Sequence, residues 1–261
     1  MIEMLLSRQK HDRLTAFLQA FGLRASVLRD EADAATANLF VVSEEDGPEL
    51  THIVFRVLGG SPLDGDNVLA AAKIDFGGGA NPLVGALPEE LVFPLDQQAQ
   101  MRGLAELFVA EAEESRCGGE TVQDRICEII VVMAIRRAID MGTVDAGLLA
   151  GLAHPVLHPC LVAMHDDPTR DWRTGTLARI AGMSRSHFIA QFTKVVGVTP
   201  AAYLTAWRLA LGHAEIAAGH SVKAAAGRVG FGSAAAFSRA FSRKYGYPPA
   251  AIRKTGSPQG S

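Results

Sequence analysis

The sequence predicts an α+β protein in which a β unit with a helix pair precedes an all-α domain that contains two helix-turn-helix motifs. Three observations predict this architecture. Strand-like runs occur only in the first half, the net charge changes sign between the halves, and one short pattern is written twice in the second half. With 261 residues, 48% of them apolar, the chain can bury a core in each of two domains.

The first half begins with a predicted helix over residues 12–21, where Leu14, Phe17, Leu18 and Phe21 recur at helical spacing. Turn-rich segments then separate three strand-like runs. The runs are ANLFVV from Ala37, THIVFRVL from Thr51 and NVLAAAKIDF from Asn67. Two helices are expected at 96–115 and 121–141, and the short RCGGE connection makes them an antiparallel pair.

Composition sets the expected domain boundaries. A stretch rich in small residues, GTVDAGLLAGL, follows the second helix of the pair and is typical of a linker. We therefore expect a first domain at 1–141, a linker at 142–152, a helical domain at 153–255 and a flexible tail at 256–261.

The charge is strongly asymmetric. Residues 1–150 carry 12 Lys and Arg against 24 Asp and Glu, a net charge of −12, whereas residues 151–261 carry 13 against 4, a net charge of +9. The alternative is chance drift of charge, but the two halves also differ in composition. The asymmetry favours a polyanionic partner for the second half alone.

The repeated pattern reads SRSHFIAQFTKVVGVTP over 184–200 and SAAAFSRAFSRKYGYPP over 233–249. In both copies a serine can cap a helix, two phenylalanines share one helix face, and a glycine ends the helix. A small residue and a turn glycine precede each copy, namely Ala178 with Gly182 and Ala226 with Gly230. Steeply crossing helices need this combination, so each copy predicts a helix-turn-helix.

The expected helices are 176–181 and 185–195 in the first motif and 224–229 and 234–244 in the second, whose turn is one residue longer. A helical solenoid is the alternative interpretation. Solenoids need three or more repeats to bury their faces, which disfavours that interpretation here.

Residues 172–254, which include WRTGTLARIAGMSRSHFIAQFTKVVGVTPAAYLTAWRLAL and HSVKAAAGRVGFGSAAAFSRAFSRKYGYPPAAIRK, closely resemble the DNA-binding domain of AraC/XylS-type transcriptional regulators. This resemblance covers about a third of the chain. It implies two helix-turn-helix motifs joined by one long helix at about 200–218. The first half is similar, more weakly, to the cupin-type sensor domains of that family, chiefly through DFGGGANPLVGALPEEL and the helix pair. Its first 70 residues are short for a cupin. The sequence therefore leaves two alternatives, a complete barrel and an open or incomplete one.

The resemblance implies a sequence-specific transcriptional regulator, not an enzyme, that binds double-stranded DNA and responds to a small-molecule effector or stress signal through a cupin-like domain. RNA polymerase and a second copy of the chain, in a homodimer, are the further partners that we expect. No export signal and no apolar run of membrane-spanning length is evident, so a cytoplasmic location and no membrane contact are expected. No cofactor is predicted.

The candidate DNA-binding residues lie opposite the first phenylalanine pair or beside that face, and along the second recognition helix. They are Arg185, Ser186, His187, Ala190 and Lys194 on the first recognition helix, and Ala235, Ser238, Arg239, Arg243 and Lys244 on the second. Arg239 is the candidate for bidentate contact with guanine, whereas Lys194, Arg243 and Lys244 are expected at phosphates. A solvated surface charge is the alternative for each.

Enzyme and sensor alternatives remain open. A cupin-like metal enzyme would need a His/Glu ligand set in the first half, which holds only His11 and His52. The histidines of HPVLHPCLVAMH, from His154, are interpreted as part of a capped helix rather than a metal site. Cys117 lies beside Arg116, a setting that can lower a thiol pKa, so a cysteine-based sensor fused to a DNA-binding module is a further alternative. A sensor that does not bind DNA would follow if the alanine-rich second recognition helix has lost its function.

The helix pair carries apolar stripes that either form a dimer interface or cover the β unit. The stripe residues are Leu104, Leu107 and Phe108 on one helix and Ile126, Ile130 and Met133 on the other. The sequence alone leaves both interpretations open.

Overall fold

The computed structural model describes residues 12–28, 36–43, 47, 49–60, 67–96, 98–114, 116–141 and 146–252. They form two compact units. The sheet unit comprises the described residues of Gly22–Gly79 and Leu83–Thr143, and the helical unit those of Met1–Phe21, Ala80–Pro82 and Val144–Ser261. The predicted tail at 256–261 lies outside the described residues.

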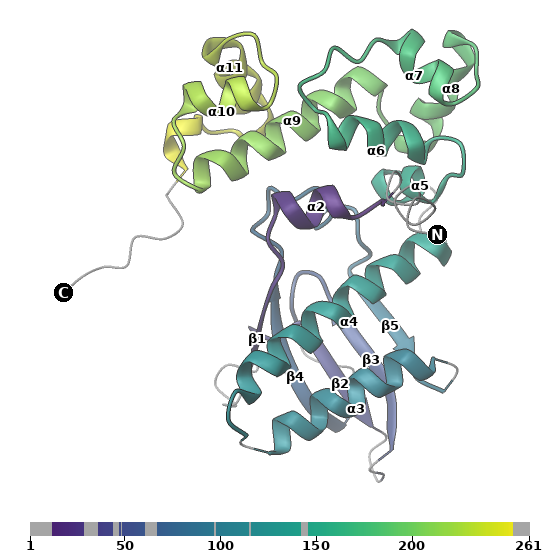
Figure 1. The fold of residues 1–261 in the computed structure, drawn as a ribbon, viewed down its shortest axis with the longest axis vertical. Helices are drawn as coiled ribbons and strands as arrows, with labels where there is room; N and C mark the ends of the chain where they lie inside the picture. The colour runs from purple at the N-terminus through teal and green to yellow at the C-terminus, as the bar shows by residue number, and fades with distance from the viewer. Residues whose placement is uncertain are drawn as a thin grey trace, which may run out of the picture. The chain divides into compact units, whose positions relative to one another are not determined.

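The sheet unit is built on one five-stranded antiparallel sheet in the order β1-β4-β2-β3-β5 (Figure 1). The strands are β1 Arg24–Val27, β2 Leu39–Ser43, β3 Leu50–Arg56, β4 Asn67–Asp75 and β5 Glu90–Pro94. All five residues of the central strand β2 are buried, so both faces of the sheet are covered there. In β4 burial alternates, with Ala70, Ala72 and Ile74 pointing inward, as the pleat of a strand requires.

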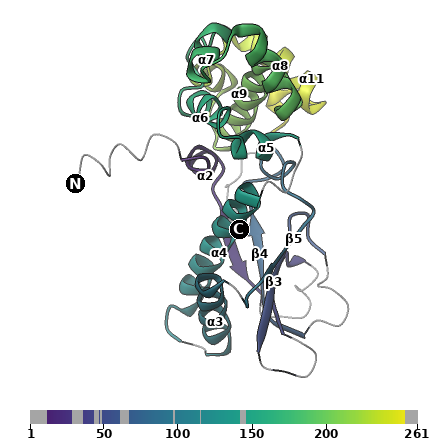
Figure 2. The same cartoon turned by 90° about the vertical axis from the view of Figure 1, so that its right-hand side faces the viewer.

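Helices α3 (Ala99–Glu113) and α4 (Gly119–Met141) lie side by side on one face of the sheet (Figure 2). Three of the six predicted stripe residues, Phe108, Ile126 and Ile130, are buried. Helix α4 packs against β1, β4 and β5, and α3 packs against β3 and β4. The stripes therefore mainly cover the sheet, although Leu107 is 45% exposed.

The sheet differs from the sequence prediction at both edges. Strands β1 and β5 were not expected, because RASV is short and ELVFP follows a turn-rich segment that lacks an alternating pattern. Within the described residues the two edge strands do not pair with each other, so the sheet is open. A buried side chain extends the pairing of β2 with β4: Asn38 Nδ2 donates to the Ile74 carbonyl at 3.0 Å, and Ile74 N donates to Asn38 Oδ1 at 2.7 Å.

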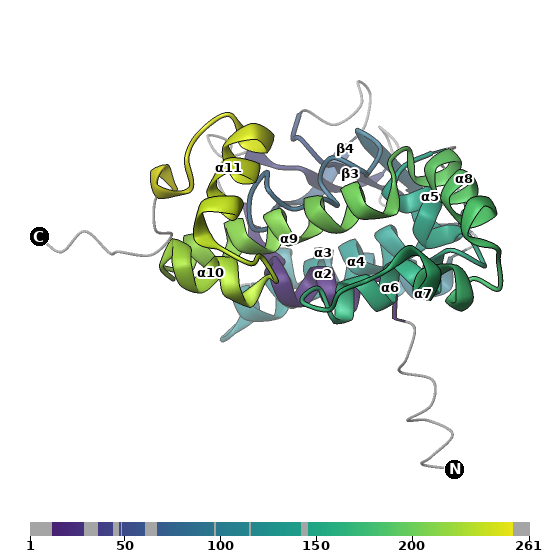
Figure 3. The ribbon, with the colours of Figure 1, turned by 90° about the horizontal axis from the view of Figure 1, so that it is seen from above.

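The helical unit contains α2 Thr15–Ala20, α5 Leu148–Ala153, α6 His158–Asp166, α7 Thr174–Ile180, α8 Arg185–Val196, α9 Pro200–Ala217, α10 Val222–Arg228, α11 Ala234–Tyr245 and the 3-10 helix η3 Pro249–Ala251. Figure 3 shows α9 running between α7 and α8 at one end and α10 and α11 at the other. The long helix that the resemblance implied at about 200–218 is thus confirmed.

Residues 12–21 pack differently from the prediction that placed them in the first domain. Phe17 of α2 is fully buried in the helical unit. Its ring stands edge-on to His165 of α6 and to Trp207 of α9, with centroid separations of 4.7 and 4.8 Å. Helical periodicity revealed the helix but carried no information about which unit it joins.

The described part of the predicted linker at 142–152 is not a linker, because most of it forms helix α5. Helix α5 begins at Leu148 and buries Leu149 and Leu152 against α6 and α8. A Cβ at Gly151 would lie 2.7 Å from Leu161 Cδ1 and 3.0 Å from Val196 Cγ2. The small residues that suggested a linker therefore permit close helix packing.

A glycine in α9 permits an equally close contact with α11. A Cβ at Gly212 would lie 2.5 Å from Cε2 and 2.7 Å from Cζ of Phe237, which is fully buried. By contrast, Gly227 of α10 is exposed and has no atom within 4 Å of its virtual Cβ. The two helical glycines therefore have opposite packing environments.

We expect Gly212→Ala to lower the free energy of unfolding by about 1–3 kcal/mol, because the methyl group overpacks the contact with Phe237. Gly227→Ala is the matched control and should raise it by up to about 1 kcal/mol through helix propensity. Urea unfolding of both variants measures the difference. Stabilisation by both substitutions would show that α9 does not approach Phe237 this closely.

His165 occupies an almost completely buried site with Phe17, Trp207 and Tyr203 around it. Its Nε2 lies 2.5 Å from Tyr203 Oη. Burial lowers the pKa of His165 to about 3, because the protonated ring would lose its hydration. The folded protein therefore holds this imidazole neutral at neutral pH.

In the unfolded chain His165 regains a pKa of about 6.5, so between pH 6.5 and 3 the unfolded state binds a proton that the folded state does not. Stability should fall as the pH drops through this window, by about 2 kcal/mol from this residue between pH 7 and pH 5. His165→Gln should flatten that dependence in unfolding experiments. Equal pH dependence in both proteins would contradict the burial of a neutral histidine.

Candidate DNA-binding interface

The first helix-turn-helix motif is made by α7 and α8. Gly182 adopts φ +64° at the turn, a left-handed conformation that glycine tolerates best. Met183 N donates to the Ala178 carbonyl at 2.8 Å and closes the turn. Ser184 caps α8, its Oγ accepting from His187 N at 3.3 Å. The predicted helices are confirmed with boundaries shifted by one or two residues.

The second motif, made by α10 and α11, repeats this construction. Gly230 adopts φ +83°, and Phe231 N donates to the Ala226 carbonyl at 2.9 Å. Ser233 caps α11 by accepting from Ala236 N at 3.1 Å. The connection between the helices is one residue longer than in the first motif, as the sequence predicts.

A phenylalanine pair fixes the rotation of each recognition helix. Phe188 and Phe192 of α8 are fully buried with ring centroids 5.6 Å apart, and Phe237 and Phe241 of α11 are fully buried at 5.5 Å. Because residues four apart share a helix face, burial of each pair turns the opposite face to solvent. Most of the predicted DNA-binding residues lie on that opposite face or beside it, whereas Arg185 and Lys244 are each three residues from a phenylalanine of the pair and lie nearer the buried face.

The predicted side chains are accessible in the helical unit. Arg185, Ser186, His187, Ala190 and Lys194 of α8 are exposed, as are Ala235, Arg239, Arg243 and Lys244 of α11, whereas Ser238 is half-buried. Ile189 adds an apolar contact surface to α8 and is 41% exposed. The structure thus brings the predicted residues together on two equivalent helices.

Two of these cations lie against their own domain. Arg185 lies over Gly175 of α7, where a Cβ would be 2.8 Å from Arg185 Nε. Lys244 Nζ donates to the Ala206 carbonyl of α9 at 3.3 Å, and partial burial of the ammonium lowers its pKa. Lys244 and Arg243 border a groove of about 480 Å³ between α9 and α11, whose other walls are mostly alanine.

Sequence reasoning missed the residues that hold these helices in place. Arg208 of α9 contacts the loop between α6 and α7, and Gly175 makes room for Arg185. A single arginine inside the apolar run AWRLAL was an available signal for a buried hydrogen-bonding role. Nothing in the local pattern marked Gly175.

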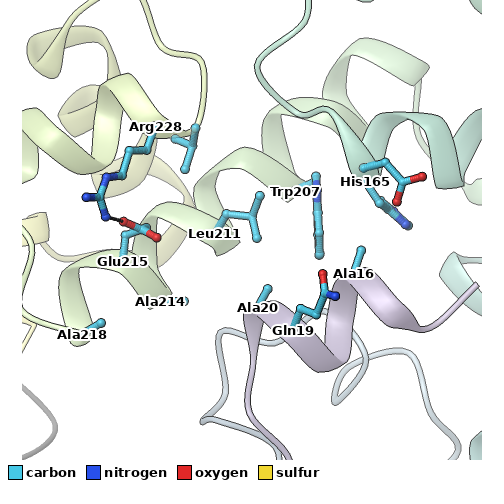
Figure 4. Close-up of a pocket in the computed structure, with 12 residues that line it drawn as sticks. Ala16, Gln19, Ala20, His165, Trp207, Leu211, Ala214, Glu215, Ala218 and Arg228 are labelled. Carbon is cyan, nitrogen blue, oxygen red and sulfur yellow. Dashed lines mark hydrogen bonds and ion pairs between the residues drawn. The ribbon is translucent and has the colours of Figure 1, made fainter.

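A pocket of about 530 Å³ opens in the helical unit between α2, α6, α9 and α10 (Figure 4). Trp207 and His165 line one part of it, and an ion pair of 2.7 Å between Arg228 Nη1 and Glu215 Oε2 lies in another. The effector expected from the resemblance was placed in the first half of the chain. This pocket lies elsewhere, in the unit that carries the recognition helices.

The histidines near α6 serve local structure. His154 Nδ1 accepts from Val156 N and Leu157 N at 3.2 and 3.3 Å. Helix α6 begins at His158. Within the described residues no three His, Cys, Asp or Glu side chains gather as metal ligands.

The cysteines differ in environment. Cys117 is exposed, and the neighbouring Arg116 is directed at the carboxylates of Glu114 and Glu111. Burial raises the pKa of the Cys160 thiol to about 12, and burial also raises the pKa of the Cys127 thiol. Among the helices of the described residues, none is both long enough and apolar enough to span a membrane.

Comparison with known proteins identifies both halves of the chain. A helix-turn-helix domain model matches residues 177–255, and a cupin model matches residues 22–140. A protein of Streptomyces lividans named as an AraC-like transcription regulator is 35% identical over 162 residues, 61% of this chain and 49% of its own length. An HTH-type transcriptional regulator of Haemophilus influenzae is 31% identical over 174 residues, 66% of this chain and 58% of its own.

The chain therefore spans about half the length of the curated relatives that it matches. These relatives are named as regulators, in agreement with the prediction that the chain is not an enzyme. Among solved structures, the DNA-binding domain of AdpA, crystallised with a target DNA, is 31% identical. The match covers 35% of this chain and 84% of that domain, with a TM-score of 0.33. The chain therefore contains a cupin domain followed by a helix-turn-helix domain, and curated proteins similar to it are named as AraC-like transcription regulators.

Proposed function

We propose that this protein is a sequence-specific, DNA-binding transcriptional regulator that acts in the cytoplasm. One observation carries the proposal: two equivalent recognition helices, each packed on a buried phenylalanine pair, are joined to one connecting helix, α9. The half of the chain that holds them, residues 151–261, has a net charge of +9. Such a pair of helices suits two major-groove segments of one duplex.

The residue types on the two helices suggest unequal roles. Helix α8 presents Ser186, Ile189 and Ala190, which can touch thymine methyl groups but offer few hydrogen bonds to base edges. Helix α11 presents Arg239, whose planar guanidinium can donate two hydrogen bonds to guanine. Lys194 and Arg243 are exposed cations suited to phosphates.

In this proposal the sheet unit has the regulatory role. Its cupin match supports a role in sensing a small molecule or stress signal. Four large apolar side chains on α3 and α4 are exposed, namely Leu107 at 45%, Val122 at 41%, Ile129 at 49% and Met141 at 59%. Val122 and Ile129 are seven residues apart and share a face, so a second copy of the chain could cover them in a homodimer. RNA polymerase is a further partner of the bound regulator.

DNA binding is tested with the full chain against a duplex library, from which an operator is selected. Affinity should fall steeply with salt because bound phosphates release counterions. Arg239→Ala should cost about 1–3 kcal/mol on the operator and flatten the base preference at one position.

Lys194→Ala is the matched comparison, since it should weaken all sequences alike and reduce the salt slope by about one. If Arg239→Ala lowers affinity yet keeps every base preference, the arginine is a phosphate contact. Absence of binding at low salt would reject the proposed function itself.

The homodimer is tested by sedimentation or light scattering of the full chain. Ile129→Glu should convert a dimer into a monomer, because it places a charge in the apolar contact. Ile189→Glu introduces the same charge at an exposed isoleucine of α8 and should leave the mass unchanged. A wild-type protein that is monomeric at all concentrations would contradict the proposed dimer.

A further inference from the structure

Arg208, in the middle of α9, holds the loop that connects α6 to α7. Its Nε donates to the Pro168 carbonyl at 2.6 Å, and its Nη2 donates to the Arg170 carbonyl at 3.0 Å. The side chain is half-buried at this contact. One guanidinium therefore joins the connecting helix to the loop from which the first motif begins.

The same loop also meets the turn of the second motif. A Cβ at Gly230 would lie 2.8 Å from Thr169 Cα, 3.2 Å from the Pro168 carbonyl oxygen and 3.3 Å from Arg208 Cζ. The loop and Arg208 thus converge on a residue that has no room for a side chain. At the matching position of the first motif, Gly182, no atom lies within 4 Å of a virtual Cβ.

The two turn glycines occupy equivalent positions in the sequence repeat but differ in the space around them. Both have a positive φ, +64° at Gly182 and +83° at Gly230, so both ease the turn. Gly230 alone of this pair also permits a contact between the second motif and the loop leading into the first. This contact ties the motifs together at a second point besides α9.

Arginine suits this position because two separate carbonyls must be bound from one planar group. The guanidinium presents its donors in a fixed fork, whereas a lysine ammonium is a compact charge on a flexible stem. A lysine could reach one carbonyl but would not hold the loop at two points. The angle between loop and helix would then be less constrained.

We propose that Arg208 is a positioning residue which, through its clamp on residues 168–170 and the close contact of that loop with Gly230, fixes the separation and angle between α8 and α11. The inference rests on the proposed DNA-binding function. Its consequence is selectivity for the spacing between the two operator segments. One inserted base pair moves a segment by about 3.4 Å and rotates it by about 35°, which a rigid pair of helices cannot follow.

The geometry is tested first without DNA. Spin labels at Ser186→Cys and Ala235→Cys, both exposed, report the distance between α8 and α11 in a Cys117→Ser background. Arg208→Lys should broaden the distance distribution, whereas Arg228→Lys, which alters a contact between α9 and α10, should leave it narrow.

Two glycine variants provide a test that does not depend on Arg208. Gly230→Ala and Gly182→Ala impose similar strain at a positive φ, but only the first collides with Thr169. We expect only Gly230→Ala to shift or broaden the distance. An unchanged distribution in folded Arg208→Lys and Gly230→Ala proteins would overturn the proposal.

Spacing selectivity is then measured with unlabelled full chain, on the selected operator and on derivatives with one base pair inserted or deleted between the segments. Wild type and Arg228→Lys should lose about tenfold or more in affinity on altered spacing, and Arg208→Lys about threefold or less. Retained selectivity in Arg208→Lys would refute the role of Arg208 in recognition. A protein that binds no DNA would instead reject the proposed function, while the distance measurement would still decide whether the clamp exists.

Discussion

Burial of two phenylalanines one turn apart beneath each recognition helix is the constraint on which the rest of the site depends. Phe188 with Phe192, and Phe237 with Phe241, are fully excluded from solvent. A helix that must bury such a pair has little freedom to rotate about its axis. The residues available to a partner are then determined by the sequence register, and so Arg239 and Lys194 face solvent.

Close contacts made at glycines join these helices to the rest of the helical unit. Gly212 lets α9 contact Phe237, Gly151 lets α5 approach α6 and α8, and Gly230 lets the second motif touch the loop before the first. These glycines carry information that is absent from the hydrophobic pattern. Replacing one of these glycines would change the distance or angle between two elements rather than unfold either element.

The sequence predicted the helical unit well because its signals are local. Caps, turn glycines and phenylalanine pairs lie within a few residues of one another, so Ser184 and Ser233 could be assigned without knowledge of tertiary contacts. The edge strands β1 and β5 were missed because short segments depend on pairing with distant partners. The packing of α2 on Trp207 and the clamp by Arg208 join residues far apart in the chain. The arginine within AWRLAL signals a hydrogen-bonding role, but no local pattern specifies its partners or those of α2.

We infer that both helix-turn-helix motifs bind one DNA duplex together, as one rigid unit. Hydroxyl-radical footprinting of the full chain on its selected operator tests this claim most directly. We expect two protected segments on the same face of the duplex, with centres about one helical turn apart, and both should be lost together on dilution. Protection of a single segment, or of two segments that titrate independently, would contradict it.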